Sequence, residues 1–160
     1  SFVAPWQGGF GTTLTWKGIS LAAQFSWVAD RWVFNNDRYL DEGNGLFETY
    51  NQSRRLLYDR WKKPGDVTDI PRYGVTPQMD SRFLEDASFL RLKNLMLSYN
   101  FPQALLKKTN FLTHLRVFVQ GQNLLTFTKF SGLDPEGVSN MYQAQYPSTR
   151  QFTFGLEVSF

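Results

Sequence analysis

The stretch QFTFGLEVSF, residues 151–160, decides the fold class. Its apolar side chains fall at every second position, with polar or small residues between them. A period of two places the two sets on opposite faces of a β-strand. The apolar set is Phe152, Phe154, Leu156, Val158 and Phe160. Because this face runs on to a final aromatic residue with nothing after it to cover it, we expect a lipid bilayer to cover it.

The composition agrees with alternating strands. Aromatic residues make up 17% of the 160 residues, yet the mean hydropathy is −0.37, so bulky apolar groups are interspersed with polar ones. No run approaches the roughly 20 consecutive apolar residues of a membrane-spanning helix. If the chain meets lipid, we therefore expect a β-barrel, the other structure that satisfies its own backbone hydrogen bonds in a membrane.

Several function classes lack the residues they need. The chain has no cysteine and one histidine, His114, which excludes thiol chemistry and disulfides and disfavours a catalytic triad or a histidine-rich metal site. No nucleophile and base stand out as a pair, and the acidic residues lie near Gly or Pro in expected turns. These acidic residues are Asp37, Asp41, Glu42 and Asp134. We expect no enzyme and no cofactor.

Residues 41–45, DEGNG, lack the ligand spacing of a calcium loop and are interpreted as a solvated turn. The net charge is +3, but the basic residues lie mostly in expected loops, so nucleic acid is not expected as a partner.

The alternating pattern predicts five strands. They cover about residues 10–16, 19–29, 89–101, 115–127 and 151–160. Lys17-Gly18 predicts a tight hairpin turn between the first two. The pattern changes phase at Lys93-Asn94, which predicts a β-bulge there. Residues 1–9 are expected to form a loop, because they contain Pro5 and a Gly pair.

Two long segments, about 30–88 and 128–150, interrupt the strands and are expected to be extracellular loops. The first should contain one short helix, over residues 51–62, capped by Asn51 or Ser53 and stopped by Pro64-Gly65. A helical turn is also possible over residues 104–108, in the connection between the third and fourth strands.

Five strands cannot close a membrane barrel, since the smallest use about eight. We therefore expect the C-terminal five-strand portion of a larger antiparallel transmembrane β-barrel. If the hairpin turn is periplasmic, the C-terminus is periplasmic too. Two aromatic rims then follow: Trp16, Tyr99, Phe101 and Phe160 at one, and Trp27, Phe127 and Phe152 at the other.

Four stretches resemble one known family. They are FLEDASFLRLKNL with LSYNFP (83–95, 97–102), GQNLLTFT with GLDPE (121–128, 132–136), YP with the closing strand (146–147, 150–160), and RW followed by DIPR (60–61, 69–72). Together, and in their order along the chain, they resemble SusC/RagA-like TonB-dependent outer-membrane transporters. The similarity extends over essentially the whole chain.

The resemblance implies the last strands of a 22-stranded barrel whose plug domain and other strands are absent from this chain. It implies an outer-membrane importer of oligosaccharides or peptides, which works with a SusD-like surface lipoprotein. It also implies energy from TonB, through a segment outside this chain. The remaining strands, the plug and outer-membrane lipid are the other expected partners, and the choice between glycan and peptide stays open.

Three sets of candidate site residues follow. Loop residues expected to contact the SusD-like lipoprotein, which forms a lid, or the substrate are Arg54, Arg55, Trp61, Arg72 and Tyr73. Residues expected to face the lumen are Thr13, Gln24, Gln120, Gln122 and Glu157. The resemblance further implies that the last strand is recognised by the barrel-assembly machinery, through Phe154, Leu156, Val158 and Phe160.

Two alternatives remain open on the residues alone. A soluble β-sandwich that binds carbohydrate would use exposed Trp and Tyr as sugar platforms, but its apolar strand faces would have to be kept from water. A self-assembling β-pore would have several copies each lending strands, and an odd number of strands disfavours it.

Overall fold

The computed structural model describes residues 3–47, 49–109, 111–137 and 139–160. The chain divides into two units. One, the sheet unit, consists of residues 6–29, 88–128 and 147–160. The other, the loop unit, consists of residues 1–5, 30–87 and 129–146.

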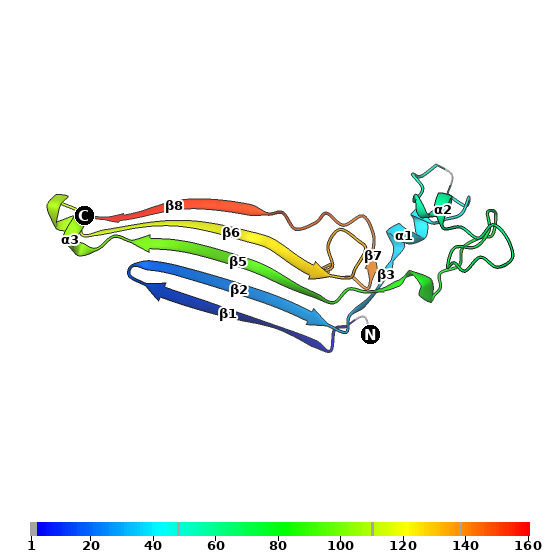
Figure 1. Ribbon diagram of the computed structural model, residues 1–160, viewed down its shortest axis with the longest axis horizontal. Coiled ribbons are helices and arrows are strands. Elements are labelled where there is room, and N and C mark those ends of the chain that lie inside the picture. Colours follow the sequence, from blue (N-terminus) through cyan, green and yellow to red (C-terminus); the bar gives the residue numbers. More distant parts are fainter. Residues whose placement is uncertain (1–2, 48, 110, 138) are drawn as a thin grey trace. The chain divides into compact units, whose positions relative to one another are not determined.

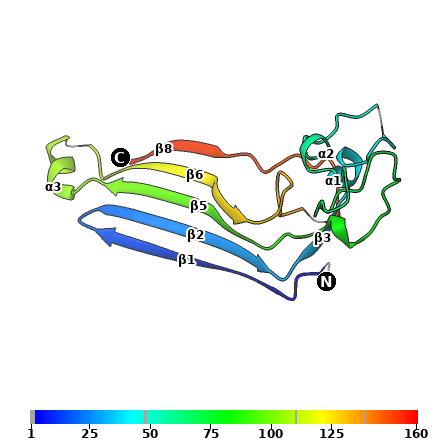
Figure 2. The same ribbon diagram turned by 45° about the vertical axis from the view of Figure 1, so that its right-hand side comes forward.

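The sheet unit is built on five strands in the order β1-β2-β5-β6-β8, each antiparallel to its neighbours (Figure 1 and Figure 2). The strands are β1 (Trp6–Trp16), β2 (Ile19–Ala29), β5 (Phe89–Asn100), β6 (His114–Thr128) and β8 (Gln151–Ser159). The helix α3 (Gln103–Leu106) and the 3₁₀-helix η2 (Lys107–Thr109) lie between β5 and β6. Four of the strands begin and end within one residue of the ranges expected from the sequence.

The first strand is longer than expected, and the prediction of a loop over residues 1–9 is wrong from Trp6 onward. Gly8 pairs with Trp27 and Gly9 pairs with Ser26. A side chain on Gly8 would lie 3.2 Å from the Trp27 ring. The glycine pair therefore does not break the strand, because it leaves room for a large ring on the neighbouring strand.

The two faces of the sheet differ in chemistry throughout. One row across all five strands consists of Leu14, Leu21, Leu97, Val119 and Phe154. The adjacent row on the opposite face consists of Thr13, Ala22, Met96, Gln120 and Thr153. The apolar face is open along the last strand, where Phe154 is 79% exposed.

The hairpin turn at Lys17-Gly18 is confirmed. Both residues have positive φ, 45° and 87°, as the two central positions of a type I′ turn require. A Cβ on Gly18 would lie 2.7 Å from the carbonyl oxygen of Asn100, so glycine is needed there for both conformation and space.

The predicted bulge is also confirmed. Lys93 interrupts the pairing of β5 with both neighbours, because the register shifts between Leu92 and Asn94. Opposite it on β6, Asn123 adopts a φ of 53° and its side-chain amide donates to Thr149 O at 3.1 Å. The extra residues re-align the strand so that the apolar face continues past the change of phase.

Phe118 lies on the polar face of the sheet, opposite Gly155 on β8. A Cβ on Gly155 would lie within the volume of the Phe118 ring. The ring therefore covers the glycine, which explains both the aromatic residue on the polar face and the glycine in the last strand.

The loop unit contains a three-stranded sheet in the order β4-β3-β7. Its strands are β3 (Trp32–Asn35), β4 (Leu84–Asp86) and β7 (Met141–Tyr142). Between β3 and β4 lie α1 (Asn36–Asp41), α2 (Arg55–Tyr58) and the 3₁₀-helix η1 (Ser81–Phe83). Val33, Ala87, Phe130 and Tyr142 form its buried cluster.

The prediction of one short loop helix is wrong in number and in length. The helix expected over residues 51–62 is only α2, because Trp61 N–H donates to Ile70 O and takes the chain out of the helix. The N-cap of α2 is Arg54, whose side chain makes no capping hydrogen bond, so the predicted cap by Asn51 or Ser53 is wrong. Ser53 Oγ only accepts from the amide of Arg55, at 3.3 Å. Helix α1, which the sequence did not predict, is capped by the Asn35 side chain, which accepts from Arg38 N–H at 3.0 Å.

None of the helices that the structure describes has the length and apolar character needed to cross a membrane.

Candidate functional site

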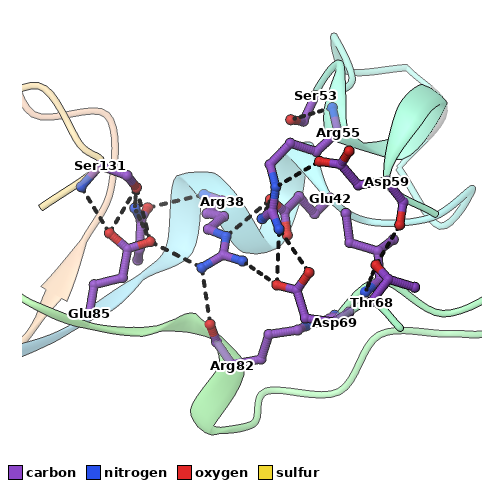
Figure 3. A network of polar contacts seen from close by, with 12 residues as sticks. Arg38, Glu42, Ser53, Arg55, Asp59, Thr68, Asp69, Arg82, Glu85 and Ser131 are labelled. Carbon is purple, nitrogen blue, oxygen red and sulfur yellow. Dashed lines mark hydrogen bonds and ion pairs between the residues drawn. The ribbon is translucent and has the colours of Figure 1, made fainter. Parts of the chain in front are cut away.

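Two arginines from different helices bind a shared set of carboxylates in the loop unit (Figure 3). Arg38 on α1 contacts Glu42 at 3.0 Å, Asp69 at 2.9 Å and Glu85 at 3.3 Å. Arg55 on α2 contacts Glu42 at 2.6 Å and Asp69 at 2.8 Å. These five residues, the ion network, connect segments that are up to 47 residues apart in the sequence.

Neighbouring residues hold the network in place. Arg38 also donates to the backbone oxygen of Arg82 at 3.1 Å, and Arg82 donates to Asp69 O at 2.8 Å. On the other side, Ser131 Oγ donates to Glu85 Oε1 at 2.9 Å. Figure 3 shows Arg38 between the Glu85 side and the Asp69 side of this arrangement.

The ion network also shifts the pKa of Asp69, one of its carboxyl groups. Burial would raise the pKa of Asp69, but the hydrogen bond and the charge of Arg55 outweigh it, so this pKa lies below its usual value. Asp41, by contrast, forms no ion pair with any described cation. Burial raises its pKa, and the charges of Asp37 and Glu42 raise it further.

A hollow of about 730 Å³ opens beside the network. Its lining includes the acidic side chains of Asp37, Asp41, Glu42 and Glu85 and the basic side chains of Arg38 and Arg55. The two arginines are engaged with carboxylates, so this hollow carries little free positive charge. Within the described residues, no group of three His, Asp or Glu is arranged to hold a metal ion.

A second hollow of the loop unit, about 500 Å³, has a different character. We call it the cationic hollow, and its lining consists of Asn44, Gly45, Gln52, Ser53, Arg54, Leu56, Leu57, Arg60 and Tyr73. Of the residues that the structure describes, two arginines and one tyrosine line it and no acidic residue does.

The five loop residues predicted to contact ligand are thus separated. Arg54 and Tyr73 line the cationic hollow, whereas Arg55 belongs to the ion network. Trp61 and Arg72 line neither hollow. The structure therefore brings two of the five predicted residues together in the cationic hollow. Arg60, the second arginine of this hollow, was not among the five.

Arg38, Asp69 and Glu85 were not among the residues predicted for a site, and Glu42 was expected only as a turn residue. Arg38 and Glu42 have the i, i+4 spacing of a helical ion pair, which is a usable signal. Glu85 lies in the three-residue strand β4 and Asp69 in an irregular segment. Neither segment is periodic, and only the fold brings these two residues to the arginines.

Comparisons with known proteins give relatives over the whole chain, although no family model matches it. TonB-dependent receptor P3 of Formosa agariphila is 34% identical over 165 residues, which cover 95% of this chain and 16% of that protein. The RagAB peptide importer in its "open-open" state superposes with a TM-score of 0.92 at 42% identity, over 100% of this chain and 18% of the solved chain. The chain is a SusC/RagA-like TonB-dependent transporter segment. SusC itself, from Bacteroides thetaiotaomicron, is 35% identical over 87 residues, covering 54% of this chain and 9% of that protein.

This SusC/RagA-like segment thus spans less than a fifth of the length of the relatives it matches. The relatives are named as receptors and importers and none of these names denotes an enzyme. The all-β antiparallel sheet agrees with the fold class expected for a piece of such a barrel.

The five residues predicted to face the lumen share one face of the sheet in this segment. Thr13, Gln24, Gln120 and Gln122 lie in two adjacent rows. Glu157 lies further along, opposite Arg116, to which it is ion-paired at 3.2 Å. A common face is what the prediction requires, while the lumen itself stays a prediction.

The residues of the predicted assembly signature share the opposite face of β8 or follow its end. Phe154, Leu156 and Val158 are exposed there. Phe160 comes after the strand, and its ring stacks on Phe111 with centroids 6.1 Å apart.

The aromatic residues assigned to two rims fall into several rows. Trp16 and Tyr99 both pair with Ile19, and Trp27 and Phe127 both pair with Leu90. Phe152 lies instead in the row of Leu95. The rims stay a prediction.

Proposed function

We propose that this chain forms the C-terminal five strands of a 22-stranded outer-membrane barrel, in a TonB-dependent importer of oligosaccharides or peptides. The superposition of the whole of this chain on part of the RagAB peptide importer, at 42% identity, carries the proposal. Most of the importer, including its plug and its TonB-contacting segment, then lies outside this chain.

The chemistry of the sheet supports a membrane wall. In the row through Phe154, all five side chains of one face are apolar, while the adjacent row on the other face contains Thr and Gln. A barrel wall with lipid outside and water inside needs this alternation. Within the described residues, β1 and β8 each have one neighbour, so each offers an edge to a further strand of the same barrel.

The open apolar face disfavours the soluble β-sandwich. In a sandwich, the apolar face of one sheet packs against a second sheet. Here Phe152, Phe154 and Leu156 are each more than 60% exposed. Water would make contact with these side chains unless lipid covered them.

The loop unit supplies the extracellular part of the proposal. Its loops, about 30–88 and 128–150, face outside and meet a SusD-like lipoprotein and the imported solute, with the C-terminus periplasmic. The ion network gives these loops a fixed shape, because it connects α1, α2 and the segments around Asp69 and Glu85.

Uptake measurements test this function. Cells that produce the complete protein and its lipoprotein partner should take up labelled oligopeptides or oligosaccharides. Uptake should fall to background when tonB is deleted or the inner-membrane proton gradient is collapsed. Uptake of both solute classes that is indifferent to TonB would refute the proposal. The intact mass of the denatured protein tests the barrel, which requires a mass several times 18.6 kDa.

A further inference from the structure

The cationic hollow contains two arginines that form no ion pair with the carboxylates of the described residues. Arg54 and Arg60 line it, and neither makes an ion pair with an acidic residue in the described parts of the chain. By contrast, both arginines of the larger hollow are bound to acidic side chains. The protein thus keeps one pair of arginines occupied and leaves another pair available.

Aromatic rings hold the two free guanidinium groups. Arg60 lies 5.4 Å from the centroid of the Tyr73 ring, and Arg54 lies 5.7 Å from that of Tyr58. A guanidinium group held over a ring in this way has fewer conformations open to it, while its N–H donors can still reach a ligand. The arginines are therefore ordered before any ligand arrives, which lowers the entropic cost of binding.

Hydrogen bonds hold the backbone on both sides of Tyr73. The buried Asn44 side chain donates to the backbone oxygens of Arg72 at 2.6 Å and Val75 at 3.0 Å. Gly45, at a φ of 97°, has the Tyr73 ring 3.1 Å from where its Cβ would lie. The tyrosine is thus held against a backbone that has no side chain to displace it.

Leu56 and Leu57 add apolar surface to the same hollow. Among the described residues, the lining combines two cations, one aromatic face and an apolar patch, and it includes no acidic side chain. It is complementary to a solute that carries a carboxylate next to an apolar or ring-shaped body, because guanidinium groups match the planar geometry of carboxylates.

We propose that the cationic hollow is a carboxylate-recognising subsite for the imported solute, with Arg54 and Arg60 binding the carboxylate and Tyr73 contacting the adjacent body. This rests on the proposed import function and specifies its substrate class as acidic. The carboxylate has two possible sources, the C-terminus of a peptide or the acid group of a uronic-acid-containing oligosaccharide.

Direct binding to the complete purified protein, with its lipoprotein partner, tests the subsite. Calorimetry would compare two matched ligand pairs: a pentapeptide with a free C-terminus against its C-terminal amide, and an oligosaccharide ending in glucuronate against one ending in glucose. We expect the acidic member of at least one pair to bind about 5- to 20-fold more tightly, the range of a charge-assisted hydrogen bond at a partly exposed site. The pair that discriminates identifies the source.

The double variant Arg54→Gln, Arg60→Gln should abolish this preference and leave the affinity for the neutral member unchanged, which also shows that the hollow is intact. Lys63→Gln removes a nearby exposed charge outside the hollow and should keep the preference. Equal binding of acidic and neutral members by the unaltered protein, or a preference that survives in the double variant, would overturn the subsite. If uptake still depends on TonB, such a result refutes the proposed subsite and leaves the proposed import function standing. Selective binding of the acidic ligand without any uptake refutes the import function and leaves the subsite standing.

Discussion

Replacing Arg38 by methionine tests whether the ion network holds the loop unit together. Methionine keeps much of the length of the side chain and removes its charge. Arg38 is only 19% exposed in its side chain and contacts three carboxylates within 3.3 Å. Two of these, Glu42 and Glu85, are 2% and 13% exposed, so they would lose a cation in a region with little access to water.

The size of the effect follows from what remains. Removing one partner of a buried ion pair costs about 3–5 kcal/mol, whereas an exposed pair contributes about 0–1 kcal/mol. Arg55 still contacts Glu42 at 2.6 Å, and Ser131 still donates to Glu85. The half-exposed Asp69 adds little. We therefore expect a loss of about 2–3 kcal/mol of local stability, less than the full buried value, which is about a 30- to 150-fold change in an equilibrium constant.

Amide hydrogen exchange measures this local opening in the intact protein. The amide of Ser131, which donates to Glu85 Oε2 at 3.0 Å, and that of Glu42, which donates to Arg38 O at 2.8 Å, should exchange faster by this factor. Arg72→Met, a change at an exposed arginine outside the network, serves as the control. Exchange at Ser131 and Glu42 that stays within threefold of the unaltered protein would refute the reasoning.

Further predictions concern single residues. The fold lowers the pKa of Asp69 below its unfolded value of 3.8, so the ionised carboxylate stabilises the fold above pH 3.8 and this stabilisation is lost only as the pH falls below that value. Protection of the amides around Asp69 from exchange should therefore hold from pH 7 to pH 5. Loss of protection within that range would show that the pKa of Asp69 is not lowered. The fold raises the pKa of Asp41, so the ionised carboxylate destabilises the fold at pH 7. Asp41→Asn should therefore slow amide exchange in α1 at pH 7 and have no effect below about pH 3.8, where the carboxyl group is protonated in both states. Faster exchange at pH 7 would contradict this prediction. Gly155→Val should displace the Phe118 ring and cost about 1–3 kcal/mol, and Phe118→Ala in the same chain should relieve part of that cost; the fraction of protein that stays folded on unheated gels measures both, and no relief would refute the contact. Phe83 is fully buried, so Phe83→Ala should cost about 3–5 kcal/mol of loop-unit stability, seen as faster proteolysis in that unit, and unchanged proteolysis would refute its place in the core.

Sequence reasoning was most successful where one physical rule dominates. A period of two is set by strand geometry alone, so it predicts which side chains share a face before the neighbours are known. The turn at Lys17-Gly18 and the bulge at Lys93 were predictable for the same reason, because each is a local backbone signal. The strand start at Trp6 was missed because Gly8 and Gly9 indicate a turn only when the ring of Trp27 is left out of account.

The loop unit was predicted less well, because its structure depends on contacts between distant segments. Helix α1 has six residues, too few for a periodic pattern to be visible. Arg55 was selected for its charge as a ligand contact, yet its carboxylate partners are Glu42, Asp59 and Asp69. In the sequence, only the i, i+4 spacing of Arg55 and Asp59 distinguishes Arg55 from Arg54. The fold is needed to show that Glu42 and Asp69 also neutralise Arg55.

The measurement that tests the membrane-wall claim most directly is the lipid exposure of β8. The chain has no cysteine, so single cysteines can be placed at Thr153, Phe154, Leu156 and Glu157, in a complete protein otherwise free of cysteine, and labelled with a fluorophore. In bilayers with a quencher attached to the lipid chains, we expect strong quenching at positions 154 and 156 and weak quenching at positions 153 and 157. Equal quenching at all four positions, or quenching by a water-soluble agent at positions 154 and 156, would contradict the account.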